Sequence, residues 1–224
     1  MFYAAEYSSP LGTISLVCNE THLLELTLET QQSRLKEKAE WIGEKEISEA
    51  QKKKVKASLA DENTSEVRAN FTNKNAEGAL AQASYKKDAA KRHALQLLGA
   101  VSCWLDSYFA GKNPDPNQLP LAPQGSAFRQ MVWKELLKIP SGQTTTYGAI
   151  AGTIAKQLHK EKMSARAVGG AVGHNPIAII IPCHRVVGSD GSLTGYAGGL
   201  DMKRKLLQHE QEFCIFPFKK AVHI

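Results

Sequence analysis

The stretch of sequence that decides the architecture is NPIAIIIPCHRVVG, residues 175–188. Its apolar run, Ile177–Ile181, has the length and composition of a buried β-strand and ends at Pro182. A cysteine, a histidine and an arginine follow at once. A cysteine reacts as its thiolate, which needs a nearby cation or a base that takes the proton, and His184 and Arg185 are candidates for these roles.

Two interpretations of Cys183 stay open from these residues alone. A free buried cysteine is commonly a core residue. A reactive role has to respect the geometry of a strand, in which neighbouring side chains point to opposite faces. Either the strand has therefore ended by Pro182, or His184 reaches the sulfur indirectly, for example through a water molecule.

The segment before this stretch is composed almost entirely of small residues. Ser164 is a good N-cap for a helix that continues as ARAVGGA, residues 165–171. With a preceding short helix, Gly148–Ala155, it forms a helix-turn-helix pattern. Adjacent glycines in a helix cost about 1 kcal/mol each relative to alanine, so something must favour them. Tight helix–helix packing is one explanation, and close approach to an external surface, with Arg166 as the one long side chain, is the other.

Two further helices and a linker are expected upstream. Apolar residues recur at helical spacing over His93–Gly111, which predicts a helix that stops at the glycine. Four prolines within Lys112–Gln124 indicate a linker, which we place at residues 116–125. Another helix begins after the N-cap Ser126 and ends before Pro140.

The N-terminal residues predict a small antiparallel sheet with the strands Phe2–Tyr7, Thr13–Cys18 and His22–Leu28. Residues 31–92 differ, because 14 basic and 10 acidic residues leave too little apolar surface for a core. We interpret them as a charged insertion, partly mobile and partly helical, with Ser33–Glu40 or Ile47–Leu59 as helices. A basic arm that touches nucleic acid through Lys52–Lys54 is the functional alternative to a solvated face.

Composition excludes some classes of protein. The 224 residues contain no apolar run near the 18 that a membrane span needs, and the N-terminus lacks the pattern of a secretory signal. Four irregularly spaced cysteines fit reduced thiols inside a cell, so we expect a cytoplasmic protein, or a nuclear one if the source is eukaryotic. The net charge of +6 permits a polyanionic partner, and residues 126–224 alone carry a net +7.

Several motifs, in one order along the chain, resemble those of the O6-alkylguanine-DNA alkyltransferase family. Residues 181–187 are similar to its active-site signature, and further similar motifs are FRQMVW (128–133), TY (146–147), ARAVGGA (165–171), NP (175–176), GYAGGL (195–200) and LLQHE (206–210). The resemblance is strong over about residues 126–211 and looser over 1–28 and 93–125. It implies an α+β protein with two domains. Residues 1–115 form a small antiparallel sheet plus a helix, ribonuclease H-like in the family, and residues 126–224 form a mainly helical, winged-helix-like domain with the helix-turn-helix.

The resemblance also implies catalytic roles. Cys183 is the alkyl acceptor, and His184 acts as its base through a bridging water, oriented by Glu210. Asn175 hydrogen-bonds around the active-site turn. Tyr147 presses on the phosphate beside the target nucleotide and helps to donate a proton towards the leaving guanine.

The remaining implied roles concern DNA. Arg166 enters the duplex and fills the gap left by the flipped-out base, while small neighbours let the helix sit in the minor groove. The residues expected at this contact are Ala165, Ala167, Gly169 and Tyr147. The pocket for the flipped base is expected to be lined by Val186, Tyr196, Ala197 and Gly198, together with the carbonyl of Cys183.

Three features depart from the family's pattern. The turn before the second helix of the helix-turn-helix, within Gly152–Met163, is longer and carries several charges. Ala197 stands where some relatives carry a serine, which favours tolerance of larger adducts or of O4-alkylthymine. Residues 31–92 have no counterpart that we identify. Cys18 and His22 alone do not complete a four-ligand zinc site, so no metal is expected.

The expected function is therefore repair of double-stranded DNA containing O6-alkylguanine by a monomeric protein that reacts once and needs no cofactor. A non-catalytic, alkyltransferase-like protein that recognises lesions is the alternative, although such proteins lack the acceptor cysteine. A transcription regulator is a further alternative, but the glycine- and alanine-rich helix has few side chains able to read base edges.

Overall fold

The computed structural model describes residues 1–43, 46–47 and 76–213. A four-stranded sheet forms the N-terminal half, with strands β1 (Tyr3–Ser9), β2 (Gly12–Cys18), β3 (Leu23–Leu28) and β4 (Glu40–Trp41) in the order β3-β2-β1-β4. The three predicted strands are confirmed, and β1–β2 and β2–β3 pair antiparallel as hairpins. Strand β4 adds a short parallel edge beside β1.

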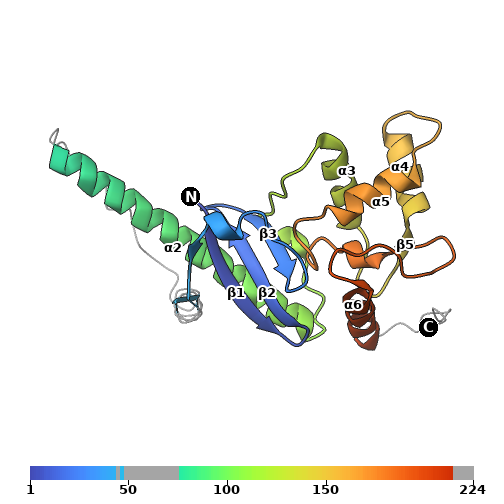
Figure 1. Cartoon of the computed structure of the whole chain (residues 1–224), viewed down its shortest axis with the longest axis horizontal. Helices are drawn as coiled ribbons and strands as arrows, with labels where there is room; N and C mark the ends of the chain where they lie inside the picture. The colour runs from blue at the N-terminus through green and yellow to red at the C-terminus, as the bar shows by residue number, and fades with distance from the viewer. Residues whose placement is uncertain (44–45, 48–75, 214–224) are drawn as a thin grey trace, which may run out of the picture.

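One long helix, α2 (Ala76–Phe109), packs across this sheet and projects beyond it at its N-terminal end (Figure 1). Its C-terminal part confirms the helix predicted at His93–Gly111. The buried side chains that face the strands are Ala90, Ala94, Leu98, Val101 and Leu105.

The prediction that residues 31–92 are partly helical is confirmed at residues 76–92, but the predicted position of the helix within this segment is wrong. Residues 76–92 continue helix α2, because six alanines there have the highest helix propensity although they supply little apolar surface. The predicted helix Ser33–Glu40 is also wrong, since only a 3₁₀ turn at Lys36–Lys38 precedes β4. The Glu25 carboxylate accepts hydrogen bonds from the Ser33 hydroxyl and the Arg34 amide, and these tertiary contacts override local propensity. Most of Ile47–Leu59, and all of Lys52–Lys54, lie outside the described residues.

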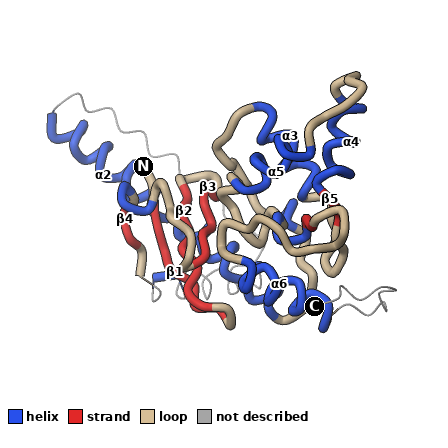
Figure 2. Tube along the Cα trace, turned by 45° about the vertical axis from the view of Figure 1, so that its right-hand side comes forward, coloured by secondary structure: helices blue, strands red, loops and turns tan. Residues whose placement is uncertain are grey.

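The C-terminal half is mainly helical (Figure 2). Its helices are α3 (Ala127–Leu136), α4 (Tyr147–Gln157), α5 (Ala165–Gly173) and α6 (Leu200–Glu212), and the short strands β5 (Thr145–Thr146) and β6 (Val186–Val187) pair parallel. Both predicted N-caps are confirmed. The Ser126 hydroxyl accepts from the amide of Arg129, and the Ser164 hydroxyl accepts from the amide of Ala167. Helices α4 and α5 form the predicted helix-turn-helix.

The buried strand predicted at Ile177–Ile181 is wrong. All five residues are buried, but only Ile177 forms an isolated bridge, to Leu26 of β3, and the chain then turns. Ile179 adopts φ 65°, a strained value for a β-branched residue. A short apolar run can form either a strand or a buried turn, and its sequence alone does not distinguish the two. Here hydrogen bonds from the side chain of Asn175 hold the backbone in a turn.

The two halves meet where β3 borders this turn. The Leu26 amide donates to the Pro176 carbonyl, and the Ala178 amide donates to the Leu26 carbonyl, both at 2.9 Å. This turn therefore lies against the edge of the N-terminal sheet. In the described ranges, no helix is both long enough and apolar enough to span a membrane.

We predict that Trp133→Phe destabilises the C-terminal half. Trp133 of α3 is buried, and its indole N–H donates to the Ala171 carbonyl of α5 at 3.0 Å. The variant loses this hydrogen bond and leaves a void, so the free energy of unfolding in urea should fall by about 1–3 kcal/mol. Trp41→Phe, at a position 47% exposed, is the matched control and should change stability by less than about 0.5 kcal/mol. Equal losses in the two variants would contradict the prediction.

Candidate active site

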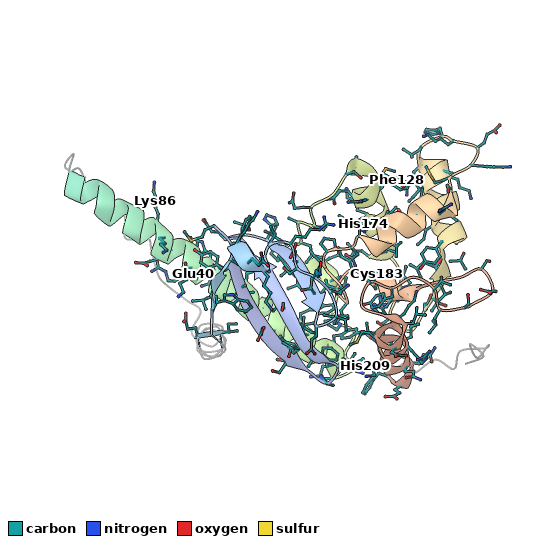
Figure 3. All side chains as sticks on the ribbon, viewed as in Figure 1. Glu40, Lys86, Phe128, His174, Cys183 and His209 are labelled. Carbon is teal, nitrogen blue, oxygen red and sulfur yellow. The ribbon has the colours of Figure 1, made fainter. Side chains whose placement is uncertain are left out.

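Cys183 is the first residue of a 3₁₀ helix, Cys183–Arg185, that follows the buried turn. Its side chain is buried in the C-terminal half, close to the junction with the sheet (Figure 3). The side-chain amide of Asn175 donates to Sγ at 3.1 Å. The imidazole of His184 forms no direct hydrogen bond with Sγ, whereas the backbone of His184 does bond the sulfur. Because the chain has left any strand geometry, the constraint of opposite faces does not apply.

Asn175 organises the turn that delivers the cysteine. Its Nδ2 donates to the carbonyl of Ile181 at 2.7 Å and to that of Ile177 at 3.3 Å, and its Oδ1 accepts from the amide of Ile177 at 3.0 Å. One buried side chain thus ties both ends of the turn to the sulfur. Asn175 thus hydrogen-bonds around this turn, and its part in a reaction stays a prediction.

His184 and Glu210 form a buried pair. His184 Nε2 and Glu210 Oε1 are 2.7 Å apart, and both side chains are essentially inaccessible to solvent. Because Glu210 accepts at Nε2, this nitrogen carries the proton and Nδ1 presents a lone pair. Nδ1 is buried and has no hydrogen-bond partner among the residues that the structure describes.

The sequence suggested Arg185 as a cation beside Cys183. In the structure Arg185 instead forms an ion pair with Glu210. Its Nη2 lies 2.8 Å from Glu210 Oε1, its Nε donates to Oε2 at 3.0 Å, and Nη1 donates to the carbonyl of Ile139. The Gly142 amide donates to Oε2 at 3.0 Å. The Tyr108 hydroxyl of α2 donates to Oε1 at 2.9 Å. Sequence reasoning missed Tyr108, and no local pattern marks it, because 102 residues separate it from Glu210.

The protonation states follow from burial and from this pairing. Burial alone would raise the pKa of Glu210, but His184 and Arg185 outweigh it and hold that pKa well below its usual range. Burial lowers the pKa of His184 despite Glu210. Burial also raises the pKa of the Cys183 thiol, against the opposing effects of the Asn175 hydrogen bond and of Lys203. At neutral pH the site therefore holds a thiol and a neutral imidazole, and the thiolate has to be generated for reaction.

Lys203 is a second residue that sequence reasoning missed. It lies on α6, on the same buried face as Leu206, Leu207 and Glu210. The spacing of three to four residues between these positions could have predicted that Lys203 is buried. The side chain is fully buried, and Nζ donates to the carbonyls of Val186 at 2.6 Å and Thr194 at 2.7 Å. Burial lowers its pKa to about 8. Lys203 thus holds the loop around Thr194 against strand β6.

The residues predicted to line the base pocket lie on this loop and on β6. The Tyr147 hydroxyl donates to the Thr194 carbonyl at 3.0 Å, and the Thr30 hydroxyl donates to the Gly198 carbonyl at 2.9 Å. A Cβ at Gly198 would meet the Tyr196 ring at 2.9 Å, so only glycine fits there. Ala197 is exposed and lines a cavity of about 450 Å³, together with Thr27, Thr30, Pro176 and Asn175. Val186, Tyr196 and Gly198 do not line that cavity.

Helix α5 presents two different faces. Val168, Ala171 and Val172 are buried, whereas Ala165, Arg166, Ala167 and Gly170 are exposed. A Cβ added to Gly170 would meet nothing within 4 Å, and one added to Gly169 would make only an ordinary contact, at 3.7 Å, with the Tyr147 ring. Internal packing therefore does not require either glycine. Of the two explanations left open by the composition, this observation favours close approach of α5 to another surface.

Two family models match the chain. The model described as 6-O-methylguanine DNA methyltransferase, ribonuclease-like domain, matches residues 2–123. The model described as 6-O-methylguanine DNA methyltransferase, DNA binding domain, matches residues 127–212.

Similar curated proteins carry the name methylated-DNA--protein-cysteine methyltransferase. The one from Methanosarcina barkeri is 54% identical over 107 residues, which are 48% of this chain and 64% of that protein. The one from Shigella flexneri is 45% identical over 126 residues, which are 56% of this chain and 71% of that protein. The chain thus spans about two thirds of the length of these relatives.

Solved structures extend the similarity over nearly the whole chain. The O6-methylguanine methyltransferase of Mycobacterium tuberculosis is 31% identical with a TM-score of 0.59, over 96% of this chain and 95% of that chain. A structure of Mycobacterium tuberculosis OGT in complex with DNA is 32% identical with a TM-score of 0.58, over 94% of each chain.

We predict that the stability contributed by Glu210 depends on pH. Its folded-state pKa lies below the unfolded value of about 4.3, so the contribution is present above that pH and is lost as the pH falls. The difference in free energy of unfolding between the wild type and Glu210→Gln should be largest near pH 7 and should shrink below about pH 5. Chemical denaturation from pH 3 to pH 7 measures it. Glu212→Gln, on an exposed residue of the same helix, is the control and should have a small effect throughout. A difference that stays constant over this range would contradict the prediction.

Proposed function

Because this chain belongs to the 6-O-methylguanine DNA methyltransferase family, we propose that it repairs DNA by transferring the alkyl group of O6-alkylguanine to Cys183. The observation that carries the proposal is a buried cysteine, hydrogen-bonded by Asn175, beside a His184–Glu210 pair whose outer nitrogen has a free lone pair. This arrangement has the three parts of an activated nucleophile: the nucleophile, a base, and a group that orients the base.

The chemistry balances without a co-reactant. Sγ of Cys183 forms a bond to the alkyl carbon as the bond from that carbon to O6 of guanine breaks. The thiol loses one proton, and the guanine gains one. We assign acceptance of the thiol proton to Nδ1 of His184 through one water, since no direct contact joins the two side chains. Tyr147 is assigned to proton donation towards the leaving guanine, as it already bonds the pocket loop at Thr194. The product thioether has no simple leaving path, so each molecule reacts once.

The target base must leave the duplex before a buried sulfur can reach it. Flipping costs a few kcal/mol, less for a damaged base, and an inserted side chain offsets part of that cost. We assign insertion to Arg166, because it is the one long side chain on the exposed face of α5. Ala165, Ala167 and Gly169 are then the residues that let the helix approach the minor groove. Val186, Tyr196, Ala197 and Gly198 hold the flipped base, and O4-alkylthymine is the second proposed substrate.

We also propose the division of the chain into residues 1–115, a linker at 116–125 and residues 126–224, with a monomer as the working form in the cytoplasm. The cysteine and the proposed DNA-binding helix then both belong to the C-terminal unit. The N-terminal unit borders the active-site turn through β3.

Transfer to Cys183 is tested with an oligonucleotide duplex bearing O6-methylguanine. Peptide mass spectrometry should find one added methyl group on Cys183 in the wild type. Cys183→Ala should lose transfer completely, and Cys103→Ala, which removes an exposed cysteine of α2, should keep it. Lesion-specific binding without any methyl on Cys183 would instead establish the non-catalytic, alkyltransferase-like alternative.

The turn between α4 and α5 extends the proposed DNA interface. Lys156 lies in the last turn of α4, and Lys160 and Lys162 lie in the turn that leads to α5, which carries Arg166. All three are exposed, and none forms an ion pair within the described part of the chain. The end of α4 and the lengthened turn thus bring three lysines and one acidic residue, Glu161, to the proposed DNA side. Each phosphate contact releases counterions and steepens the dependence of affinity on salt.

We predict that the triple variant Lys156→Gln, Lys160→Gln, Lys162→Gln lowers the slope of log K against log salt by about 2–3, since each phosphate contact contributes about 0.9. Fluorescence anisotropy with unmodified duplex DNA measures the slope. The matched control removes three exposed lysines of the N-terminal half, by Lys38→Gln, Lys86→Gln and Lys112→Gln. If the two triple variants behave alike, the turn is not part of the interface.

A further inference from the structure

Glu210 receives a hydrogen bond from the other half of the molecule. The hydroxyl of Tyr108, near the C-terminal end of α2, donates to Glu210 Oε1 at 2.9 Å, and both side chains are only 3% exposed. The other donors to Glu210 are His184, Arg185 and Gly142, which all belong to the C-terminal half. Tyr108 is therefore the one described donor that reaches this carboxylate from the N-terminal half.

We propose that Tyr108 is a positioning residue for the transfer reaction, whose hydroxyl holds Glu210 Oε1 and sets how strongly this carboxylate stabilises a proton on His184. The inference rests on the proposed function. It adds to that function a contribution of the N-terminal half to the reactivity of the C-terminal cysteine.

The Tyr108 hydroxyl bonds the same carboxylate oxygen of Glu210 that accepts the hydrogen bond of His184 Nε2. Oε1 accepts from Tyr108 and also from His184 Nε2 at 2.7 Å and Arg185 Nη2 at 2.8 Å. Each donor withdraws negative charge from the shared oxygen. Because the surroundings are buried, such changes in charge are screened weakly. Removing the Tyr108 hydroxyl leaves Oε1 more negative, and this favours the imidazolium form of His184.

Tyr108 is held so that its hydroxyl cannot turn away. Its ring stacks on Trp104 with centroids 5.7 Å apart and packs edge-on against Phe109. His209 of α6 lies 5.4 Å from the ring and bonds the Tyr108 carbonyl at 3.1 Å. Burial and the neighbouring Glu210 hold the pKa of Tyr108 well above its ordinary value. The hydroxyl therefore remains a donor over the pH range in which His184 titrates.

The charged and titratable groups that face His184 and Glu210 come from three helices and one loop. Helix α2 supplies Tyr108, the 3₁₀ helix supplies Cys183 and Arg185, and α6 supplies Lys203; Tyr196 of the pocket loop faces Glu210 and Cys183. Tyr108→Phe removes one oxygen atom and keeps the ring and its packing. The junction also keeps its backbone bonds between Leu26 and the active-site turn and the Thr30–Gly198 bond.

The test compares Tyr108→Phe in the full chain with Tyr7→Phe. Tyr7 also donates to a carboxylate of α2, Asp106, at 2.7 Å, and its ring stacks on Phe109, but it forms no hydrogen bond with Glu210, His184 or Cys183. The control variant therefore loses a similar bond without the proposed effect. The first measurement is the titration of His184 by nuclear magnetic resonance without DNA, and the second is the pH profile of the single-turnover rate.

Tyr108→Phe should raise the pKa of His184 and move the acid limb of the rate profile to higher pH, each by about 0.3–1 unit, while Tyr7→Phe should match the wild type. Incorporating 3-fluorotyrosine at position 108 keeps the shape, strengthens the donor and should move both quantities in the opposite direction. This second variant decides the question if Tyr108→Phe fails to fold. A His184 pKa that is the same in the wild type and the altered chains overturns the inference. If the wild type transfers no methyl group, the proposed function is refuted. The titration of His184, which needs no DNA, would still test whether Tyr108 affects the pKa of His184.

Discussion

The carboxylate of Glu210 is the group on which the arrangement of the site depends. Removing a carboxylate from water costs several kcal/mol, and the cost is offset only where charge and hydrogen bonds surround it. Here Arg185 supplies the charge, while His184, Gly142 and Tyr108 supply further donors. These donors come from the 3₁₀ helix, from the loop after α3 and from α2. Satisfying one buried anion therefore fixes three segments relative to α6, and with them the orientation of the imidazole.

A second buried polar side chain, Asn175, holds the turn that carries the sulfur. Asn175 satisfies the backbone of a turn that has no strand partners of its own and donates to Sγ. Strand β3 then closes the turn from the N-terminal half. Cys183 thus sits between two polar networks in an otherwise apolar region. Burial raises the pKa of its thiol, which is therefore neutral, and the proposed proton acceptor is the His184–Glu210 pair.

Sequence reasoning succeeded where the signal is local and failed where a distant side chain decides. Short patterns predict the strands of the first 28 residues, the caps Ser126 and Ser164 and the helix that begins after Ser164, and the structure confirms them. The apolar run Ile177–Ile181 has the composition of a strand, yet Asn175 turns it into a buried loop. Likewise, no helix forms at Ser33–Glu40, because this segment bonds the carboxylate of Glu25 instead. The alanine-rich residues 76–92 extend helix α2, although their few large apolar side chains gave no helical pattern in the sequence.

By itself, the sequence determined which chemical groups are present and in what order: Cys183 beside His184, Glu210 on a helix, and a helix of small residues carrying Arg166. Those groups lie within short motifs, so a resemblance to a family could identify them. Only the tertiary structure decided that Arg185 pairs with Glu210 rather than with the cysteine, that Lys203 is buried against the pocket loop, and that Tyr108 enters the site. The physical reason is that each of these contacts satisfies a buried charge or polar group, and which distant atom satisfies it is set by the packing of the two halves.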